Sequence, residues 1–249
     1  LNDAGARVIV VFDAMLHTLA SVLHETPVET VVLARIGDLF PRVKRSLYNF
    51  VSARRRGHRL AAVPGLVSFR DVLSRGRTLE TKAVDIQAGD IAFLQYTGGT
   101  TGVSKGAMLS HRNMIANALQ TNAWMNIAAR AGEEIAITAL PLYHVLALSL
   151  NCFSLMALGG MNYLITNPRD VDQFVREMAR VPFTGFFGVN TLYASLLNAP
   201  EFRALDFSTL RLAGGGGSAV QRPIAERWHE ITGTQIIEGY GLTESSGAL

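Results

Sequence analysis

The residues best suited to chemistry lie in a glycine-rich segment at positions 96–106, which reads YTGGTTGVSKG. Its glycines let backbone N–H groups turn toward an anion without obstruction by side chains. Its threonine and serine hydroxyls add hydrogen-bond donors, and Lys105 adds a compact, mobile positive charge. This combination predicts a loop that binds phosphate groups. A flexible surface loop is the alternative, and the threonine pair together with the lysine argues against it.

The segment is not a Walker A loop, in which the lysine directly follows a glycine and precedes serine or threonine. Here Val103 and Ser104 separate Gly102 from Lys105, and Gly106 follows the lysine. The apolar run IAFLQY at 91–96 predicts a strand just before the loop. We therefore expect the loop at the carboxyl end of a strand, where α/β sheets bind their ligands.

The elements around this loop alternate between short β-rich runs and helical patterns, which predicts an α/β fold with parallel strand pairs. Asp13 is expected to cap a helix with the apolar stripe Leu16, Leu19, Ala20 and Leu23, and Ser110 to cap a helix that reaches Met125. The other expected helices lie at 144–158, 170–180, 190–198 and 220–232. The expected strands lie at 6–11 (buried), 29–35, 91–96, 134–140, 162–166, 183–189 and 210–215.

The composition excludes several classes of protein. Of 249 residues, 49% are hydrophobic and 17% are charged, as in a folded domain with an apolar core. The single cysteine, Cys152, excludes an internal disulfide framework and fits a reducing, cytoplasmic compartment. The start LNDAGARVIVVFD lacks the features of a signal peptide and has no initiator Met. We expect the chain to be an internal piece of a longer protein.

Positive charge is concentrated at residues 42–77, which contain ten Lys and Arg and one acid, Asp71. Gly57, Pro64, Gly65 and Gly76 interrupt this basic segment, so we expect an excursion from the sheet. It is either a solvated helix and loop, or a surface that meets an anionic membrane or an anionic cofactor. Aromatic residues do not interleave the charges as nucleic-acid binding requires, so no nucleic-acid partner is expected.

A run of 34 residues, 135–168, has no acidic or basic side chain apart from His144. Its length would allow a membrane span. Pro141, Asn151, the pair Gly159-Gly160 and Asn162 divide it into strand, turn, helix and strand. We expect a buried α/β core there instead of a span.

Together, four segments in this order resemble the adenylate-forming superfamily of acyl-CoA synthetases, luciferases and peptide-synthetase adenylation domains. YTGGTTGVSKG resembles its phosphate signature, and LPLYH at 140–144 resembles the segment beside the acyl pocket. AGGGGSAV at 213–220 resembles the adenine-side loop, and EGYGLTE at 238–244 resembles the segment that holds adenine and magnesium. YLITNPRD at 163–170 is most similar to bacterial long-chain fatty-acid–CoA ligases.

The resemblance implies a fold and a reaction. The chain would be part of the large N-terminal AMP-binding domain, with layered sheets and helices, truncated at both ends and without the small C-terminal lid domain. The full-length protein would use ATP and Mg²⁺ to convert a medium- or long-chain fatty acid to an acyl-adenylate, then transfer the acyl group to coenzyme A. This part alone is expected to be inactive. An aryl or short-chain acid as substrate, and a non-catalytic nucleotide-binding module, remain as alternatives.

The resemblance also implies roles for matched residues. Glu244 would bind magnesium, Thr243 would contact the α-phosphate, and His144 would orient the substrates without transferring a proton. With Lys105, these residues form the expected catalytic set. The phosphates would be held by Thr97, Gly98, Gly99, Thr100, Thr101, Gly102 and Lys105. The adenine side would be formed by Gly217, Ser218, Gly239, Tyr240 and Gly241. Ala219 departs from the proline that is frequent in this loop.

The substrate pocket and the partners are less constrained by the sequence. Five apolar residues could line an acyl tunnel, and each could equally belong to an ordinary core; they are Val145, Leu148, Phe186, Val189 and Leu192. The expected partners are fatty acid, ATP and CoA. Peripheral contact of the basic segment with the inner face of the cell membrane, and a homo-oligomer, remain open.

Overall fold

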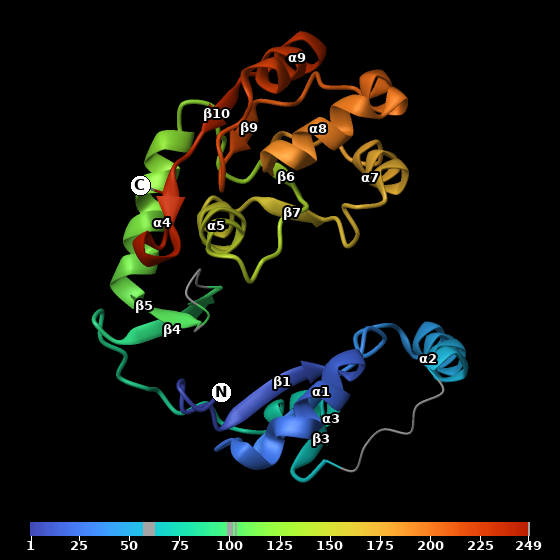
Figure 1. Cartoon of the computed structure of the whole chain (residues 1–249), viewed down its shortest axis with the longest axis vertical. Helices are drawn as coiled ribbons and strands as arrows, with labels where there is room; N and C mark the ends of the chain where they lie inside the picture. The colour runs from blue at the N-terminus through green and yellow to red at the C-terminus, as the bar shows by residue number, and fades with distance from the viewer. Residues whose placement is uncertain (57–62, 99–101, 103, 249) are drawn as a thin grey trace. The chain divides into compact units, whose positions relative to one another are not determined.

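The computed structural model describes residues 1–56, 63–98, 102 and 104–248, and side chains within these ranges except those of 52–56 and 248. The chain divides into two compact units, Leu1–Asp85 and Ile86–Leu249. Figure 1 shows the elements of both.

The first unit is built on a parallel three-stranded sheet with the order β1-β2-β3. The strands are β1 (Val8–Phe12), β2 (Thr30–Ala34) and β3 (Leu66–Ser68). The helices are α1 (Leu16–Val22), α2 (Arg42–Arg56) and α3 (Phe69–Gly76), with short 3₁₀ turns at Asp13–Met15 and Leu23–Glu25. The core of this unit combines the α1 stripe, including Leu16 and Leu19, with Val31 and Leu33 of β2.

Three expectations for this unit need correction. The first strand is not buried on both faces, because Val8, Val10 and Phe12 alternate with half-buried residues and are 54–61% exposed. Asp13 does not cap the helix: it begins a 3₁₀ turn, and Met15 is the N-cap of α1. The basic segment is not a pure excursion, because its β3 pairs with β2 and completes the sheet.

The second unit contains a parallel five-stranded sheet with the order β10-β9-β8-β6-β7. Four of these strands were expected, and β10 was missed. Their bounds are β6 (Ile135–Thr138), β7 (Met161–Leu164), β8 (Gly185–Gly188), β9 (Leu212–Gly215) and β10 (Ile236–Glu238). The central strands β6, β8 and β9 are mostly buried, as expected where crossover helices cover both faces of a parallel sheet, and the edge strands β7 and β10 are more exposed.

Helices cover the two faces of this sheet. One face is covered by α7 (Val171–Met178), α8 (Asn190–Asn198) and α9 (Arg222–Thr232). A 3₁₀ turn, Pro200–Ala204, follows α8 in the chain. The core beneath these helices is aromatic: the Phe186 ring stacks on Trp228 at 5.4 Å and meets Tyr193 edge-on at 5.2 Å. All three rings are fully buried, so this face is held by dense packing.

The opposite face is covered by the end of α4 (His111–Met125) and by the helix over residues 145–157. This second helix begins as α5 (Val145–Ala147), continues as a π-helical stretch (Leu148–Ser154) and ends as α6 (Leu155–Ala157). Ser110 caps α4 in a capping box with Asn113, which confirms the expected start. Residues 135–168 contain a strand, the helix over 145–157 and a second strand, which agrees with their expected division. No helix in the described ranges is long and apolar enough to cross a membrane.

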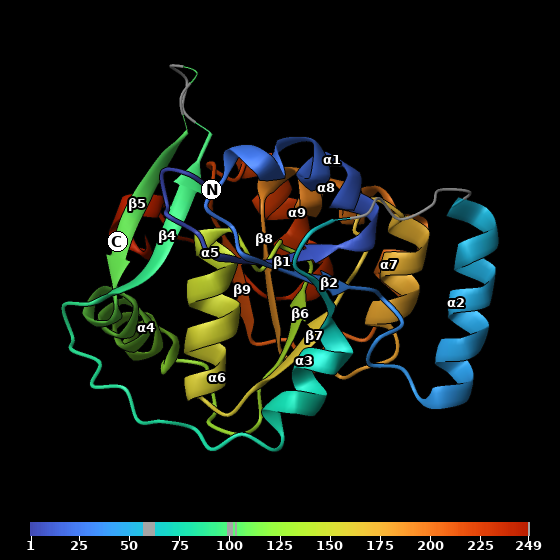
Figure 2. The ribbon, with the colours of Figure 1, turned by 90° about the horizontal axis from the view of Figure 1, so that it is seen from below.

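The glycine-rich segment follows a strand, as expected, but this strand lies outside the five-stranded sheet. The segment joins β4 (Ile91–Thr97) to β5 (Lys105–Ser110) in an antiparallel hairpin. The two strands run side by side, and β5 leads directly into α4 (Figure 2). The hairpin packs on the helix over 145–157, where Phe93 meets Phe153 edge-on at 5.9 Å.

Candidate functional site

The parallel sheet brings three of the four motifs to one edge. Because β6, β8, β9 and β10 all run in the same direction, the loops that follow them emerge at a common carboxyl edge. LPLYH follows β6. The adenine-side loop AGGGGSAV begins within β9 and continues after it, and EGYGLTE begins at the end of β10. Segments that are about 100 residues apart in the chain thereby form one surface.

Backbone hydrogen bonds join these loops. The Gly216 N–H donates to the carbonyl of Gly188 at 3.2 Å, and the Gly239 N–H donates to the carbonyl of Gly215 at 2.8 Å. A Cβ on Gly216 would lie 3.3 Å both from the Gly239 carbonyl oxygen and from Leu146 Cδ2, just after LPLYH. Gly216 therefore permits the close approach of three segments. Gly217 has a φ of 76°, which favours glycine.

Two polar side chains that sequence reasoning missed brace the adenine-side loop. A Glu238 carboxylate oxygen accepts from the Val220 N–H at 3.0 Å, and Asn190 Oδ1 accepts from the Gln221 N–H at 2.9 Å. Each bond joins the loop after β9 to the end of a neighbouring strand or start of a helix. Glu238 is the first residue of EGYGLTE, so the motif itself contained a signal. Nothing in the sequence pattern singles out Asn190.

The adenine candidates are open to solvent at this edge. Tyr240 is 69% exposed, and Gly217, Ser218, Gly239 and Gly241 are also exposed. An exposed aromatic ring next to open backbone suits stacking on a planar base. The structure thus brings together the residues expected on the adenine side.

The phosphate loop is placed by its hairpin. Thr97 pairs with Lys105 across the strands, and its hydroxyl donates to the Lys105 carbonyl at 3.4 Å. Tyr96 lies over Gly106, where a Cβ would be 3.0–3.4 Å from the ring. Lys105 and Gly98 are exposed, and Gly102 has a φ of 88°. Three predicted members of the loop, Gly99, Thr100 and Thr101, lie outside the described residues.

Two contacts connect the phosphate hairpin to the motifs at the sheet edge. The Gln95 side-chain amide on β4 donates to the carbonyl of Tyr143 in LPLYH. The 3₁₀ turn Thr243–Ser245, which holds half-buried Thr243 and exposed Glu244, contacts β5. The lysine strand, the threonine–glutamate pair and the LPLYH loop are therefore neighbours. Gln95 was not predicted as a site residue.

The segment after EGYGLTE fixes the position of that turn. β11 (Gly241–Leu242) pairs antiparallel with β12 (Gly247–Ala248) on either side of it. A Cβ on Gly247 would lie 3.0 Å from Ser149 Cβ and 3.1 Å from Asn117 Oδ1. The β11–β12 hairpin thus fits closely against α4 and against the helix over 145–157. Both of these helices also pack against the β4–β5 hairpin.

His144 is exposed and caps α5, although a lone histidine between apolar stretches is more often in a core. Its Nδ1 accepts from the Leu146 backbone N–H at 3.3 Å. An accepting Nδ1 places the proton of the neutral ring on Nε2. The ring can then donate a hydrogen bond from Nε2, which suits an orienting role.

The five acyl-pocket candidates do not converge on one cavity. Val145 and Leu148 pack with Leu109 and Met114 beneath the hairpin. Phe186 belongs to the aromatic core beneath α7, α8 and α9, and Leu192 packs against that core. For these two residues the structure agrees with the alternative of an ordinary core. Val189 borders the adenine-side loop, 3.5 Å from a Cβ built on Gly217. The acyl pocket therefore stays a prediction.

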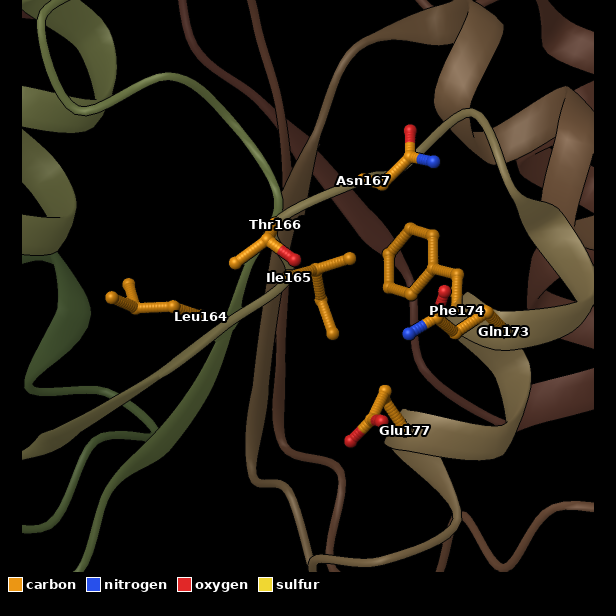
Figure 3. A pocket seen from close by; sticks show the side chains of 7 residues that line it. All are labelled: Leu164, Ile165, Thr166, Asn167, Gln173, Phe174 and Glu177. Atoms are coloured by element: carbon orange, nitrogen blue, oxygen red, sulfur yellow. The ribbon is translucent and has the colours of Figure 1, made fainter. Parts of the chain in front are cut away.

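A small cavity of about 190 Å³ lies elsewhere, between the end of β7 and α7 (Figure 3). Ile165 and Phe174 face each other across it, and Glu177 lies at its rim. The Glu177 carboxylate already accepts from the Tyr163 hydroxyl at 2.7 Å and from Arg180 at 2.8 Å. The bond to Glu177 raises the pKa of the Tyr163 hydroxyl. No predicted site residue lines this cavity.

The amino edge of the five-stranded sheet holds a buried ion pair that sequence reasoning missed. Glu134 is 2% exposed and accepts from the Arg130 N–H and from Arg211 Nη2, both at 2.6 Å, and from the Thr184 hydroxyl. Burial alone would raise the pKa of Glu134, but these hydrogen bonds and the Arg211 charge hold the pKa below its ordinary 4.5. The cluster joins residues next to β6, β8 and β9.

Comparison with known proteins gives consistent results. The family described as AMP-binding enzyme matches residues 1–249. A long-chain-fatty-acid–CoA ligase of Escherichia coli O157:H7 is 49% identical over 247 residues, which is 98% of this chain and 44% of the relative. A feruloyl-CoA synthase of Amycolatopsis is 31% identical over 186 residues, 70% of this chain and 37% of the relative. The chain spans less than half the length of these curated relatives.

Solved structures show the same fold. The anthranilate CoA ligase AuaEII in complex with anthranoyl-AMP matches with a TM-score of 0.80 at 23% identity, over 100% of this chain and 43% of that one. A long-chain-fatty-acid-CoA ligase from Archaeoglobus fulgidus matches with a TM-score of 0.72 at 20% identity, over 100% and 45%. These likenesses confirm the expected α/β fold class.

Proposed function

The chain belongs to the AMP-binding enzyme family, and on this premise we propose that it is the nucleotide-binding part of a long-chain fatty-acid–CoA ligase. The observation that carries the proposal is the 49% identity, over 98% of this chain, to a relative with that name. The arrangement of the motifs at one sheet edge supports it, because the reaction needs a nucleotide and an acid side by side.

The proposed reaction has two steps. In the first, a carboxylate oxygen of the fatty acid attacks the α-phosphorus of ATP, and the bond to the bridging oxygen breaks, releasing pyrophosphate. In the second, the sulfur of coenzyme A attacks the acyl carbon, the bond to the AMP oxygen breaks, and the thiol proton leaves to solvent. Neither step needs a protein nucleophile. The protein contributes by bringing anions together and by stabilising charge on the phosphates.

The described residues suit these tasks. Lys105, exposed on β5, would neutralise phosphate oxygens as negative charge shifts toward pyrophosphate. Tyr240 would stack on the adenine, and Thr243 would donate to the α-phosphate. His144 would donate from Nε2 to a substrate oxygen. A general base is unnecessary, because a carboxylic acid is already ionised at neutral pH.

The donor set also fits a magnesium ion that arrives with ATP. Among the described residues, no three or more His, Cys, Asp and Glu side chains cluster as an all-protein metal site. Mg²⁺ typically binds through one or two carboxylates, substrate phosphates and waters, so exposed Glu244 is a sufficient protein ligand. When bound, the ion would supply positive charge to the phosphates.

A panel of acids tests the proposal. The full-length protein is given ATP, Mg²⁺ and palmitate, octanoate, benzoate, ferulate or acetate, and pyrophosphate release is measured with and without CoA. We expect palmitate to give the highest kcat/KM, and acyl-CoA to form in proportion to pyrophosphate. Faster turnover of benzoate, ferulate or acetate would refute the fatty-acid assignment while leaving adenylation intact. No pyrophosphate with any acid would favour a non-catalytic nucleotide-binding module.

A further inference from the structure

Gln95 lies on β4 between a core residue and the start of the phosphate loop. Side chains two residues apart on a strand share a face, so Gln95 lies on the same side of the β4–β5 hairpin as Phe93 and Thr97. Phe93 packs on the apolar cluster beneath the hairpin and meets Phe153 edge-on. Thr97 pairs with Lys105 at the end of the ladder. Gln95 is therefore two residues from the core anchor and two residues from the first residue expected to hold phosphate.

The Gln95 side chain reaches across to the LPLYH loop. Its Nε2 donates to the Tyr143 carbonyl at 2.5 Å, over a separation of 48 residues in the chain. Packing of the Tyr143 side chain does not hold this loop, because Tyr143 is 79% exposed. The next residue is His144, whose Nδ1 accepts from the Leu146 N–H. The hydrogen bond from Gln95 therefore determines where the loop, and with it His144, lies relative to the hairpin.

A glutamine suits a contact that must not disturb the phosphates. Its amide donates a hydrogen bond without adding charge, whereas a lysine would attract phosphate oxygens in competition with Lys105. Gln95 is half-buried, and a hydrogen bond is stronger where water is partly excluded. In the proposed first step, the carboxylate oxygen and the α-phosphorus must come within about 3–3.5 Å, and a displacement of about 1 Å can slow a reaction about 100-fold. The position of the LPLYH loop relative to the phosphate loop therefore matters more for adenylation than for the binding of either substrate.

We propose that Gln95 is a positioning residue for acyl-adenylate formation, whose hydrogen bond to Tyr143 holds His144 at the distance from the phosphate loop that the attack on the α-phosphorus requires. This inference rests on the proposed ligase function and adds a residue to it. Gln95 touches neither substrate in this role and acts through the LPLYH loop. Loss of its hydrogen bond leaves each binding segment intact but changes their relative position. The binding of ATP alone and of acid alone should therefore survive, and the rate of the joint step should fall.

Single-turnover formation of acyl-AMP by the full-length protein tests this role. Gln95→Met removes the amide and keeps the length of the side chain, and Gln173→Met, at an exposed position on α7, is the matched control. We expect Gln95→Met to slow acyl-AMP formation from palmitate about 3- to 10-fold, which is the effect of one hydrogen bond between neutral groups. The Kd of ATP and the Kd of palmitate, each measured without the other substrate, should stay within about twofold of the wild type. The control should match the wild type in all three measurements.

A double-mutant cycle with His144→Ala separates positioning from a general loss of stability. If Gln95 acts through the loop that carries His144, Gln95→Met should slow the reaction little further once His144→Ala is present. A general loss of stability would slow the reaction by the same factor in both backgrounds. Because water can reach the exposed Tyr143 segment in place of the amide, Gln95→Met should keep a melting temperature within about 2 °C of the wild type.

Hydrogen–deuterium exchange gives a readout that does not depend on the reaction. In the wild type, ATP should slow exchange in β4 and β5 and also in residues 140–146, because the hydrogen bond joins these segments. In Gln95→Met, ATP should protect β4 and β5 only.

The outcomes separate this inference from the proposed function. ATP that protects neither segment of the wild type would refute the proposed function. Equal exchange of residues 140–146 in the two ATP-bound proteins would refute the role of Gln95 alone. So would a wild-type rate of acyl-AMP formation by Gln95→Met, or a loss of rate by the same factor with and without His144→Ala.

Discussion

Replacing Glu134 by Gln tests how the amino edge of the five-stranded sheet is held. The substitution keeps the shape of the side chain and its ability to accept from the Arg130 N–H and from Arg211. The new amide can donate to the Thr184 hydroxyl oxygen, which then donates to the Ile135 carbonyl 3.4 Å away. The change therefore removes the charge and keeps the accepted hydrogen bonds, and it leaves one N–H of the new amide without a partner among the bonds that Glu134 makes.

The expected loss of stability follows from the three hydrogen bonds that Glu134 accepts. A hydrogen bond to a charged group contributes about 1 kcal/mol more than one between neutral groups. Three such bonds set an upper value of about 3 kcal/mol, and partial solvation of Arg211, whose side chain is 24% exposed, reduces it. We expect a loss of about 2 kcal/mol, which corresponds to roughly 30-fold faster exchange of the most protected amides.

Hydrogen–deuterium exchange of peptides that cover β6 and β8 measures this loss in the full-length protein. The control is Glu133→Gln, because neighbouring Glu133 is 61% exposed and lies 3.6 Å from Arg130 in a surface pair. Such a pair contributes about 0–1 kcal/mol, so this variant should exchange almost like the wild type. Equal exchange in the two variants would refute the idea that the buried ion pair holds the strands.

The difference in exchange between the wild type and Glu134→Gln should depend on pH. The folded pKa of Glu134 lies below its ordinary 4.5, so its stabilisation is fully present above about pH 4.5 and is lost as pH falls through the folded value. Glutamine does not titrate. The difference in exchange between wild type and Glu134→Gln should be constant from pH 7 to pH 5 and should shrink below about pH 4.5. A difference that persists far below this pH would contradict the lowered pKa.

Three further predictions concern the site. Lys105→Ala should slow single-turnover formation of acyl-AMP by about 100- to 1000-fold with little change in fatty-acid binding, since one charged contact to a transferring phosphate contributes a few kcal/mol; an unchanged rate would remove Lys105 from the site. Glu244→Gln should shift the magnesium titration of activity to at least about tenfold higher concentration, and a curve that overlays the wild type would count against Glu244 as the ligand. Gly217→Ala should weaken ATP binding, because its φ of 76° strains any residue with a side chain by about 1–2 kcal/mol. Gly233→Ala, with a φ of 74° at the end of α9, is the matched control and should lower stability without altering ATP affinity.

The sequence predicted the elements of the five-stranded sheet well where apolar runs were bounded by glycine, proline or a cap. The helix from Ser110 to Met125 agrees with its expected limits, because a capping residue precedes it and its length is sufficient. β10 was missed because only Ile236 and Ile237 distinguish it, and three residues are too few for a period to be recognised. β5 was missed because its sequence, KGAMLS, has neither alternation nor β-branched residues.

The candidate site was predictable as a set of motifs and not as a geometry. The exposed adenine-side residues and the pair Thr243 and Glu244 were named from ordered motifs. Gln95 and Glu238 were missed, because their partners Tyr143 and Val220 lie 48 and 18 residues away in the chain. Glu134 was missed for the same reason, with partners 50 and 77 residues away. The acyl-pocket residues were not brought together, because cores and pockets have the same apolar composition.

The separation of phosphate and adenine residues onto different elements has a structural consequence. The adenine side belongs to loops of a buried parallel sheet, where backbone hydrogen bonds from Gly216 and Gly239 join adjacent strand ends. The phosphate loop belongs to an antiparallel hairpin outside that sheet, connected to the LPLYH loop through Gln95. Because the described part of the hairpin shares no strand pairing with the five-stranded sheet, its distance from the adenine-side loop depends on side-chain packing, such as Phe93 against Phe153. The packing beneath the hairpin, and not the sheet itself, therefore sets the distance between Lys105 and Tyr240, the two residues that we propose hold the phosphate and adenine ends of the nucleotide.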